Sequence, residues 1–130
     1  MHLGAVSLLV RDYDDAIAWF VEKLGFVVIA DERPSESKRW VMVGPPSGQA
    51  GLVLAQPATA EQARELGRQA GGGVFLFLHT EDFARDHAAF VARGVVFVEE
   101  PRRESYGIVA VFEDVSGNRW DLIQHTQSKA

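Results

Sequence analysis

Hydrophobic and polar positions recur in the same order in the two halves of the chain, about seventy residues apart. In each half an apolar run leads to an aspartate followed by an aromatic residue, then to apolar positions at helical spacing, then to a glycine. Strand-like sequence follows. A period of this length predicts two copies of one supersecondary unit, neither of which buries its apolar face alone. The matching pairs are Val6–Val10 with Val74–Leu78, Asp12 with Asp82, and Gly25 with Gly94.

The first copy is predicted to contain a strand, a helix and three further strands. Asp12 is placed as the N-cap of the helix, because its carboxylate can accept hydrogen bonds from the exposed amides of the first turn. Gly25 supplies the left-handed residue that ends this helix. The expected segments are strands at Leu3–Val10, Phe26–Ala30, Arg39–Val43 and Gly51–Ala55, a helix at Asp14–Leu24, a hairpin connection at Asp31–Lys38 and a turn at Ser47-Gly48-Gln49.

The second copy repeats this order after a linker. Good helix formers at Ala60–Gln69 predict a short surface helix, and Gly71-Gly72-Gly73 predicts a flexible joint. We place module 1 at about 1–57, the linker at 58–73 and module 2 at about 74–126, within a single domain of 130 residues. Module 2 is expected to contain strands at Val74–Leu78, Val95–Val98, Ile108–Phe112 and Arg119–Gln124, a helix from Asp82 to about Arg93, and a loop at Pro101–Gly107.

Composition excludes several classes of function. The chain has no cysteine, which rules out disulfides, thiolate metal sites and cysteine nucleophiles. A net charge of −5, with acidic and basic residues interspersed, opposes nucleic-acid binding, which requires a clustered positive surface. The apolar runs are too short to span a bilayer, and Met1 leads almost directly into a strand, which leaves no room for a signal peptide. We therefore expect a cytoplasmic protein that binds neither nucleic acid nor membrane.

Two segments carry a resemblance to a known family. The sequence AIAWFVEKLGF at Ala16–Phe26 and the sequence FEDVSGNRWDL at Phe112–Leu122 resemble the vicinal oxygen chelate superfamily, and the resemblance extends over residues 3 to 125. This superfamily includes glyoxalase I, extradiol dioxygenases, fosfomycin-resistance enzymes and bleomycin-binding resistance proteins. The resemblance implies an α+β fold in which two βαβββ modules form curved mixed sheets around a cavity. It also implies a homodimer.

The resemblance further implies four positions for metal ligands, on the first and last strand of each copy. In this chain those positions hold Ala5, Val53, Phe75 and Asp121. The first three side chains have no lone pair to offer, and one carboxylate does not hold a divalent cation tightly, since such sites need several oxygen or nitrogen donors. We therefore expect no metal at these positions and no cofactor.

Without a metal, the predicted site is an apolar pocket with few polar groups, which suits a small organic ligand. Trp40 and Tyr106 lie near strand ends, where their rings would cover its mouth or pack in the core or an interface. Asp121 would anchor a ligand amine, act as a general base, or bond to the backbone or an arginine. By alternation along the strands, the predicted lining residues are Ala5, Ser7, Leu9, Val53, Phe75, Phe77 and Asp121.

The loop that contains Arg102 is the most highly charged in the chain. Arg102 and Arg103 beside Glu104 form either a solvated surface pair or an anion clamp for a carboxylate or phosphate of the ligand.

His79 and His125 are further candidates for the site. His79 shares a strand face with Phe77, and His125 follows Asp121 by four residues. The side chains of Asp121, His79 and His125 would therefore converge if their strands are neighbours. Otherwise His79 ends a strand at the cavity rim and bonds to a neighbouring group or water.

Two functions of different classes remain open. The first is a metal-free binding protein, similar to the bleomycin-resistance branch, that holds a small, partly aromatic ligand in a cavity at a homodimer interface. The second is a lyase, isomerase or oxygenase of glyoxalase or dioxygenase type, with Asp121 and His79 as its catalytic acid–base pair and a relocated metal or none. We favour the binding protein, because catalysis needs positioned polar groups and the sequence contains few of them.

Overall fold

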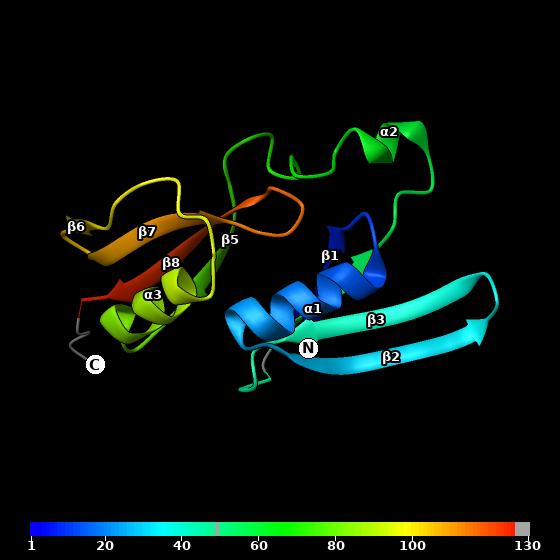
Figure 1. Ribbon diagram of the computed structural model, residues 1–130, viewed down its shortest axis with the longest axis horizontal. Coiled ribbons are helices and arrows are strands. Elements are labelled where there is room, and N and C mark those ends of the chain that lie inside the picture. Colours follow the sequence, from blue (N-terminus) through cyan, green and yellow to red (C-terminus); the bar gives the residue numbers. More distant parts are fainter. Residues whose placement is uncertain (49, 127–130) are drawn as a thin grey trace. The chain divides into compact units, whose positions relative to one another are not determined.

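The computed structural model describes residues 1–48 and 50–126, so the turn predicted at Ser47-Gly48-Gln49 lies partly outside the described residues. The chain forms two compact units, Met1–Leu66 and a second unit that begins at Gly67. Each unit contains a four-stranded mixed sheet and a helix that packs on it (Figure 1). The predicted α+β class and the βαβββ order of each copy are confirmed. The organisation of both copies as a single domain stays a prediction.

In the first unit the sheet order is β1-β4-β3-β2. Strands β1 and β4 are parallel, whereas β4 with β3 and β3 with β2 are antiparallel. A parallel pair needs a crossover connection, and the helix together with the β2–β3 hairpin supplies it. The elements are β1 (Ala5–Leu9), α1 (Tyr13–Leu24), β2 (Val27–Ser35), β3 (Lys38–Gly44), β4 (Gly51–Ala55) and the short helix α2 (Ala60–Ala63).

The second unit repeats this topology, with the sheet order β5-β8-β7-β6. Strands β5 and β8 are parallel, and the remaining neighbours are antiparallel. The elements are β5 (Val74–His79), α3 (Phe83–Ala92), β6 (Arg102–Glu104), β7 (Gly107–Glu113) and β8 (Arg119–His125). Within the described residues, no helix is long and apolar enough to cross a membrane.

Both long helices begin at the aspartates that the sequence indicated. The Asp12 carboxylate accepts a hydrogen bond of 2.8 Å from the amide of Asp15, and the Asp82 carboxylate accepts one of 3.0 Å from the amide of Arg85. Helix α1 ends at Gly25, whose φ of 74° is left-handed. Side-chain capping of this kind satisfies amides that have no partner within the helix, which fixes where each helix starts.

Strand β2 is longer than predicted, because it continues through Asp31–Ser35, where we expected a hairpin connection. As the edge strand of its sheet, β2 tolerates charged side chains and Pro34, since no further strand needs the missing N–H group. Arg39 on the neighbouring strand β3 donates two hydrogen bonds of 2.9 Å to the Asp31 carboxylate. Side-chain pairing across the hairpin thus replaces the apolar packing that a sequence pattern detects.

The strand predicted at Val95–Val98 is wrong. This segment forms only an isolated bridge between Phe97 and Phe112. The strand that completes the four-stranded sheet is β6, Arg102–Glu104, inside the segment predicted as a loop. Phe97 is held by its ring, which lies 4.4 Å from the His87 ring and 5.7 Å from the Phe112 ring, centroid to centroid. Phe97 thus packs against α3 and β7, whereas Val96 and Val98 are exposed, and the apolar period of the segment does not distinguish this arrangement from a strand.

The helix predicted at Ala60–Gln69 is confined to Ala60–Ala63. The chain turns at Gly67, whose φ of 75° is left-handed and whose hydrogen faces the Ser116 carbonyl oxygen. A Cβ atom at Gly67 would collide with that oxygen, so only glycine permits this approach. Tertiary contact with the β7–β8 turn therefore overrides the helix propensity of the segment.

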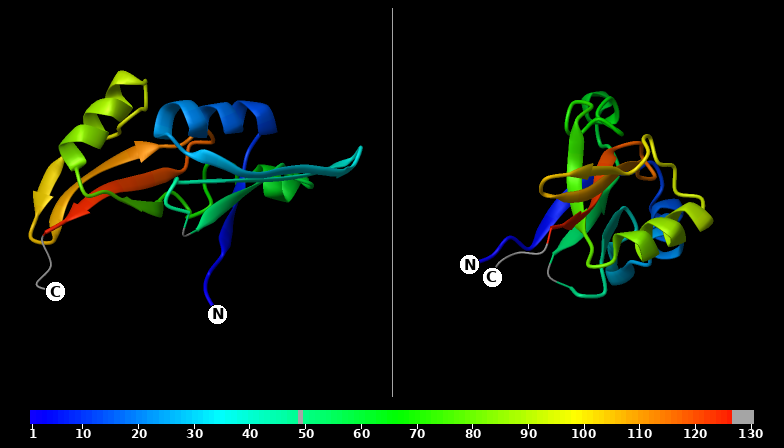
Figure 2. Two further views of the ribbon diagram at one scale, coloured as in Figure 1. Left: turned by 90° about the horizontal axis from the view of Figure 1, so that it is seen from below. Right: turned by 90° about the vertical axis from the view of Figure 1, so that its left-hand side faces the viewer.

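Each sheet has one face covered by its helix, as the edge-on view in Figure 2 shows. In the first unit the covered face includes Leu8, Val41 and Leu54, which are buried together with Phe20 of α1. In the second unit it includes Phe112, Trp120 and Leu122, and the Phe90 ring of α3 meets the Phe112 ring edge-on at 5.6 Å. Burial of each such side chain contributes about 1.5–3 kcal/mol.

Arg39 ties helix α1 to its sheet. Besides its bonds to Asp31, its guanidinium donates a hydrogen bond of 2.9 Å to Asp14 of α1 and lies 5.3 Å from the centre of the Tyr13 ring. The Asp31 carboxylate has a lowered pKa, because Arg39 hydrogen-bonds to its charged form. A planar guanidinium suits this role, since it binds a carboxylate through two N–H groups and still stacks on an aromatic ring.

Asp114 organises the turn between β7 and β8. Its carboxylate is buried and accepts hydrogen bonds from the amides of Ser116, Gly117 and Asn118 at 2.9–3.0 Å. The Trp120 indole N–H donates a further bond of 2.9 Å, and the Asn118 side chain one of 3.3 Å. Burial raises the pKa of the Asp114 carboxyl, while these hydrogen bonds act in the opposite direction. The motif FEDVSGNRWDL thus builds a turn around one acceptor.

We predict that Asp114→Ala lowers the free energy of unfolding by about 3 kcal/mol, because it leaves several buried donors without an acceptor. Trp120→Phe removes one donor and keeps the ring, so it should cost about 1 kcal/mol. Urea unfolding followed by circular dichroism measures both values. A loss for Asp114→Ala no greater than that for Trp120→Phe would contradict the central role of this carboxylate.

Candidate functional site

The uncovered face of the first sheet carries the predicted lining residues of module 1. Ser7 of β1 pairs with Val53 of β4, which pairs in turn with Met42 of β3, so these three side chains form a row on the face opposite α1. Ala5 and Leu9 lie on the same face at the two ends of β1, and both are half-buried. The face is therefore made of small and medium apolar side chains. Trp40, 45 % exposed, lies two residues from Met42 on this face.

The uncovered face of the second sheet is formed by matching rows. Val111 of β7, Asp121 of β8 and Phe77 of β5 are register partners and share this face. In the next row, Ile123 pairs with His79. Val111 and Ile123 are buried, whereas Phe77 is 60 % exposed, so the face has an apolar floor and an exposed aromatic side. Phe75 lies at a register irregularity and is half-buried.

Asp121 is the polar group of this floor. Its Oδ1 atom is the one buried side-chain nitrogen or oxygen atom in the described part of the chain that has no hydrogen-bond partner. Burial raises the pKa of the Asp121 carboxyl; the positive charge of Arg102 lowers it, and the negative charge of Glu99 raises it further. A buried acceptor without a donor costs free energy, so its presence in a folded site calls for an explanation.

Arg102 is engaged by two carboxylates. Its guanidinium donates a hydrogen bond of 2.9 Å to Glu99 and another to Glu104. Hydrogen bonds to Glu99, Glu104 and Tyr106 raise the pKa of the Arg102 guanidinium. A carboxylate or phosphate on a ligand would compete with these two glutamates for the charge of Arg102. The anion clamp stays a prediction.

Histidine and tyrosine rings lie at the end of the same sheet. The His79 and His125 rings are 4.7 Å apart, and the Tyr106 ring lies 6.5 Å from that of His125. Tyr106 is 46 % exposed, and its carbonyl accepts a hydrogen bond of 2.7 Å from the amide of Thr126, which holds the β6–β7 turn against the end of β8. Neighbouring strands thus bring together the two histidines whose convergence the sequence left open.

The residues present do not fit a metal centre of the kind that the superfamily implies. Of the four equivalent positions, Ala5, Val53 and Phe75 offer no donor atom, and Asp121 stands alone. No group of three or more histidine, aspartate or glutamate side chains within the described ranges is arranged to hold an ion. His79 faces Ile123 rather than Asp121 in the register, so Asp121, His79 and His125 do not form such a group.

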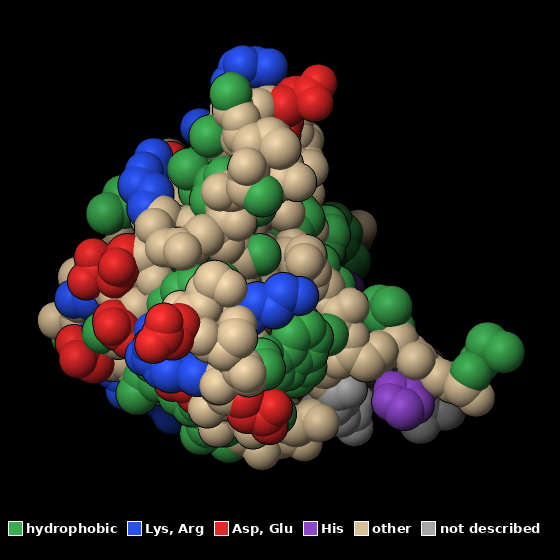
Figure 3. Space-filling view, turned by 90° about the vertical axis from the view of Figure 1, so that its right-hand side faces the viewer, with side chains coloured by type: hydrophobic (Ala, Val, Ile, Leu, Met, Phe, Trp, Pro, Cys, Tyr) green, Lys and Arg blue, Asp and Glu red, His purple; other side chains and the backbone are tan. Residues whose placement is uncertain are grey.

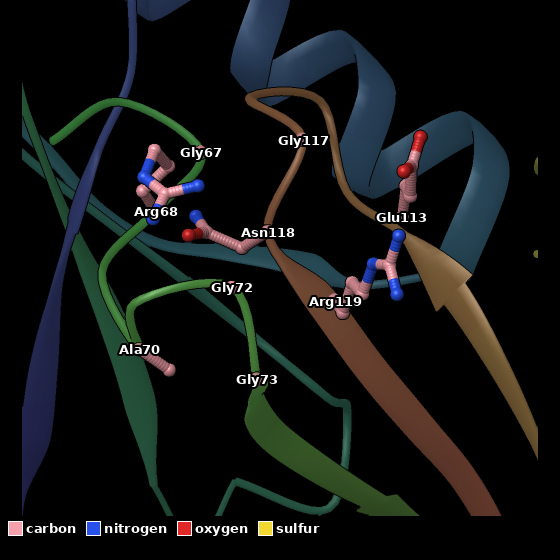
Figure 4. Close-up of a pocket in the computed structure, with 9 residues that line it drawn as sticks. All are labelled: Gly67, Arg68, Ala70, Gly72, Gly73, Glu113, Gly117, Asn118 and Arg119. Carbon is pink, nitrogen blue, oxygen red and sulfur yellow. The ribbon is translucent and has the colours of Figure 1, made fainter. Parts of the chain in front are cut away.

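A polar hollow of about 360 Å³ lies elsewhere on the second unit, between the Gly67–Gly73 segment and the β7–β8 turn (Figure 4). Its lining is mainly backbone, with the side chains of Arg68, Glu113, Asn118 and Arg119 at its border. None of the predicted site residues lines it. The Asn118 side chain joins the two borders of the hollow: its oxygen accepts a hydrogen bond of 3.0 Å from the Gln69 amide, and its nitrogen donates one of 3.3 Å to Asp114 of the turn.

Charged side chains of both signs lie next to one another on the face of the molecule that Figure 3 shows, with hydrophobic side chains exposed between them. This distribution agrees with the interspersed charges of the sequence.

Sequence reasoning missed the role of two residues. Glu99 lies outside the predicted site, and the sequence indicates Glu104 only as a loop neighbour of Arg102, yet both hydrogen-bond to Arg102, whose charge acts on Asp121. Their spacing of three before and two after Arg102 is compatible with such contacts, but an exposed ion pair has the same spacing. The lack of a hydrogen-bond donor for Asp121 Oδ1 depends on how the strands are arranged, and no sequence pattern indicates it.

Fold and sequence comparisons define the class of this protein. The sequence profile of the Glyoxalase/Bleomycin resistance protein/Dioxygenase superfamily matches residues 2–122, and the chain belongs to this superfamily. It is 50 % identical to an uncharacterized protein of Shewanella frigidimarina, over 92 % of this chain and 90 % of that protein. Among solved structures it is similar to UcmS2, with 33 % identity, a TM-score of 0.83 and coverage of 95 % of this chain and 97 % of that one.

It is also similar to TnmS3, an antibiotic binding protein from Streptomyces sp. CB03234. The two share 30 % identity, with a TM-score of 0.78 and coverage of 97 % of each chain. The fold is thus one that is used for ligand binding.

We predict that Asp121→Leu raises the free energy of unfolding of the ligand-free protein by about 1 kcal/mol, because it removes an unsatisfied buried acceptor. Since the pKa of this carboxyl is raised above 3.8 in the folded protein, its charged form penalises folding only as the pH rises beyond that value. The advantage of the variant should therefore be small near pH 3.8 and grow toward neutral pH. Urea unfolding across this range measures it, and a variant less stable than the native protein at pH 7 would contradict the prediction.

Proposed function

We propose that this protein binds a small organic, partly aromatic ligand without a metal ion, on the uncovered sheet face that contains Asp121. The observation that carries the proposal is the combination on one face of a buried apolar floor, an exposed aromatic ring and a single unsatisfied acceptor. Apolar walls with few polar groups are typical of small-molecule sites. The likeness to an antibiotic binding protein supports binding rather than another use of the fold.

Each unit has its own set of residues that we propose as candidates for ligand contact. In the second unit we propose Asp121, Phe77, Phe75, Tyr106 and Arg102. In the first unit we propose the residues of the uncovered apolar face, namely Ala5, Ser7, Leu9, Trp40 and Val53.

The enzymatic alternative has less support. Asp121 and His79 lie on one face but in different register rows, and Asp121 Oδ1 accepts no hydrogen bond from any described residue. An acid–base pair works when its members are within hydrogen-bond reach of each other or of the same substrate atom. Two groups on one face are compatible with catalysis but do not define a reaction.

We predict that Phe77→Ala weakens binding of an aromatic ligand about tenfold or more, because stacking on this ring is lost. Val91→Ala is the matched control, since Val91 is also an exposed apolar residue of the second unit but lies on α3. Equilibrium dialysis against a panel of aromatic antibiotics, with and without a chelator, measures affinity. Elemental analysis of the purified protein measures metal content.

Unchanged affinity in the chelator and in Val91→Ala, together with the loss in Phe77→Ala, would support the proposal. A stoichiometric divalent metal, or binding abolished by the chelator, would refute the metal-free site. No binding across the panel, or equal affinities of the two variants, would refute the aromatic site on this face.

We also propose that the chain functions in the cytoplasm as a homodimer, as many members of the superfamily do, with both modules in one domain. Sedimentation equilibrium should give twice the mass of one chain at micromolar concentration. The mass of one chain at that concentration would contradict the dimer.

A further inference from the structure

Asp121 points to the chemistry of the ligand, provided that the function proposed above holds. Its Oδ1 atom is buried and accepts no hydrogen bond from the described residues. By contrast, the buried carboxylate of Asp114 on the same hairpin accepts five hydrogen bonds. A carboxylate oxygen accepts and does not donate. The complement of Asp121 is therefore a hydrogen-bond donor that comes from outside the described chain.

The charges near Asp121 favour a positive donor. Arg102 is the cation that acts on this carboxyl, and it is already paired with Glu99 and Glu104. Three carboxylates, those of Asp121, Glu99 and Glu104, against one guanidinium leave a net charge of −2 in this cluster. Such a cluster attracts a cation and repels an anion, and a charged hydrogen bond is about twice as strong as a neutral one.

The ring of Phe77 also favours a positively charged, aromatic ligand. Phe77 is the register partner of Asp121 on β5, so its ring starts from the next strand on the same face. Its side chain is exposed and hence available to a ligand. An aromatic face stacks on the aromatic part of a ligand and attracts a cation held nearby.

We propose that the ligand carries a basic nitrogen attached to an aromatic body: the ammonium group donates to Asp121 Oδ1, and the aromatic part lies against Phe77. The ligand class is thus a cationic aromatic amine, in preference to a neutral phenol or an aromatic acid of the same size.

Three probes with one aromatic body test this proposal: 2-naphthylmethylamine, 2-naphthylmethanol and 2-naphthoic acid. Their affinities are measured by protein NMR titration and calorimetry on the native protein, Asp121→Asn, Phe77→Ala and Glu113→Gln. Glu113→Gln is the matched control, since it removes one negative charge from an adjacent register row of the same sheet, and Glu113 is not among the charges that act on the Asp121 carboxyl. All four proteins are first compared by thermal unfolding to establish that they are folded.

The native protein should bind the amine about tenfold more tightly than the alcohol, and the acid most weakly. Asp121→Asn should reduce the affinity for the amine to about that for the alcohol, and should leave the alcohol within about twofold. Phe77→Ala should weaken the amine and the alcohol alike, and Glu113→Gln should change neither by more than about twofold.

Equal affinities for amine and alcohol in the native protein would overturn the cationic ligand. So would an Asp121→Asn variant that keeps the preference for the amine. If Phe77→Ala still weakens all probes in either case, the proposed binding face stands while this inference falls. If none of the probes binds and none shifts the resonances of the second unit, the proposed function falls together with it.

Discussion

The covering of each sheet by a helix on one face only is the constraint on which the rest of this structure depends. Successive side chains of a strand point to opposite faces, so a helix on one face turns every second residue into core and leaves the others on the opposite face. In the first unit this divides Leu8 and Leu54 from Ser7 and Val53. An apolar sheet face that no helix covers favours contact with something else that removes it from water, such as a ligand or another protein surface.

The face of the second sheet opposite α3 contains both buried and exposed side chains, and two aspartates of one hairpin differ in how their oxygens are bonded. Asp114 and Asp121 lie on the same β7–β8 hairpin; Asp114 is buried, and Asp121 is half-buried. Asp114 has every acceptor position supplied by the turn that it organises, which is the arrangement expected of a structural residue. Asp121 has a buried oxygen with no donor, an arrangement that lowers stability and is tolerated where function requires it.

Much of the fold could be predicted from the sequence because its signals are local. The caps at Asp12 and Asp82, the left-handed Gly25 and the apolar periods fix both helices and most strands within a few residues. The failures are tertiary. The strand through Asp31 depends on the guanidinium of Arg39, and the shortened helix before Gly67 depends on contact with another turn.

The candidate site was predictable only in part for the same reason. Alternation placed Phe77 and Asp121 on one face, which the register bears out. It could not show that Glu99 and Glu104 occupy Arg102, because ion pairs between a loop and a strand edge follow no period. Without those two contacts, Arg102 would be predicted to pair with Asp121 or with an acidic ligand. The expected ligand would then be an anion instead of a cation.

The charge of Asp121 therefore sets the chemistry of the whole face. At the equivalent position in a metal-binding member, the charge of a carboxylate is neutralised by the ion that it coordinates. In the metal-free state that we propose, the compensating charge must come from the protein or from what binds there. The nearby guanidinium is held by two other carboxylates, and Phe75 on the neighbouring strand of the same sheet offers only hydrocarbon. This charge balance is the reason that we propose a ligand with both an apolar body and a positive donor for this face.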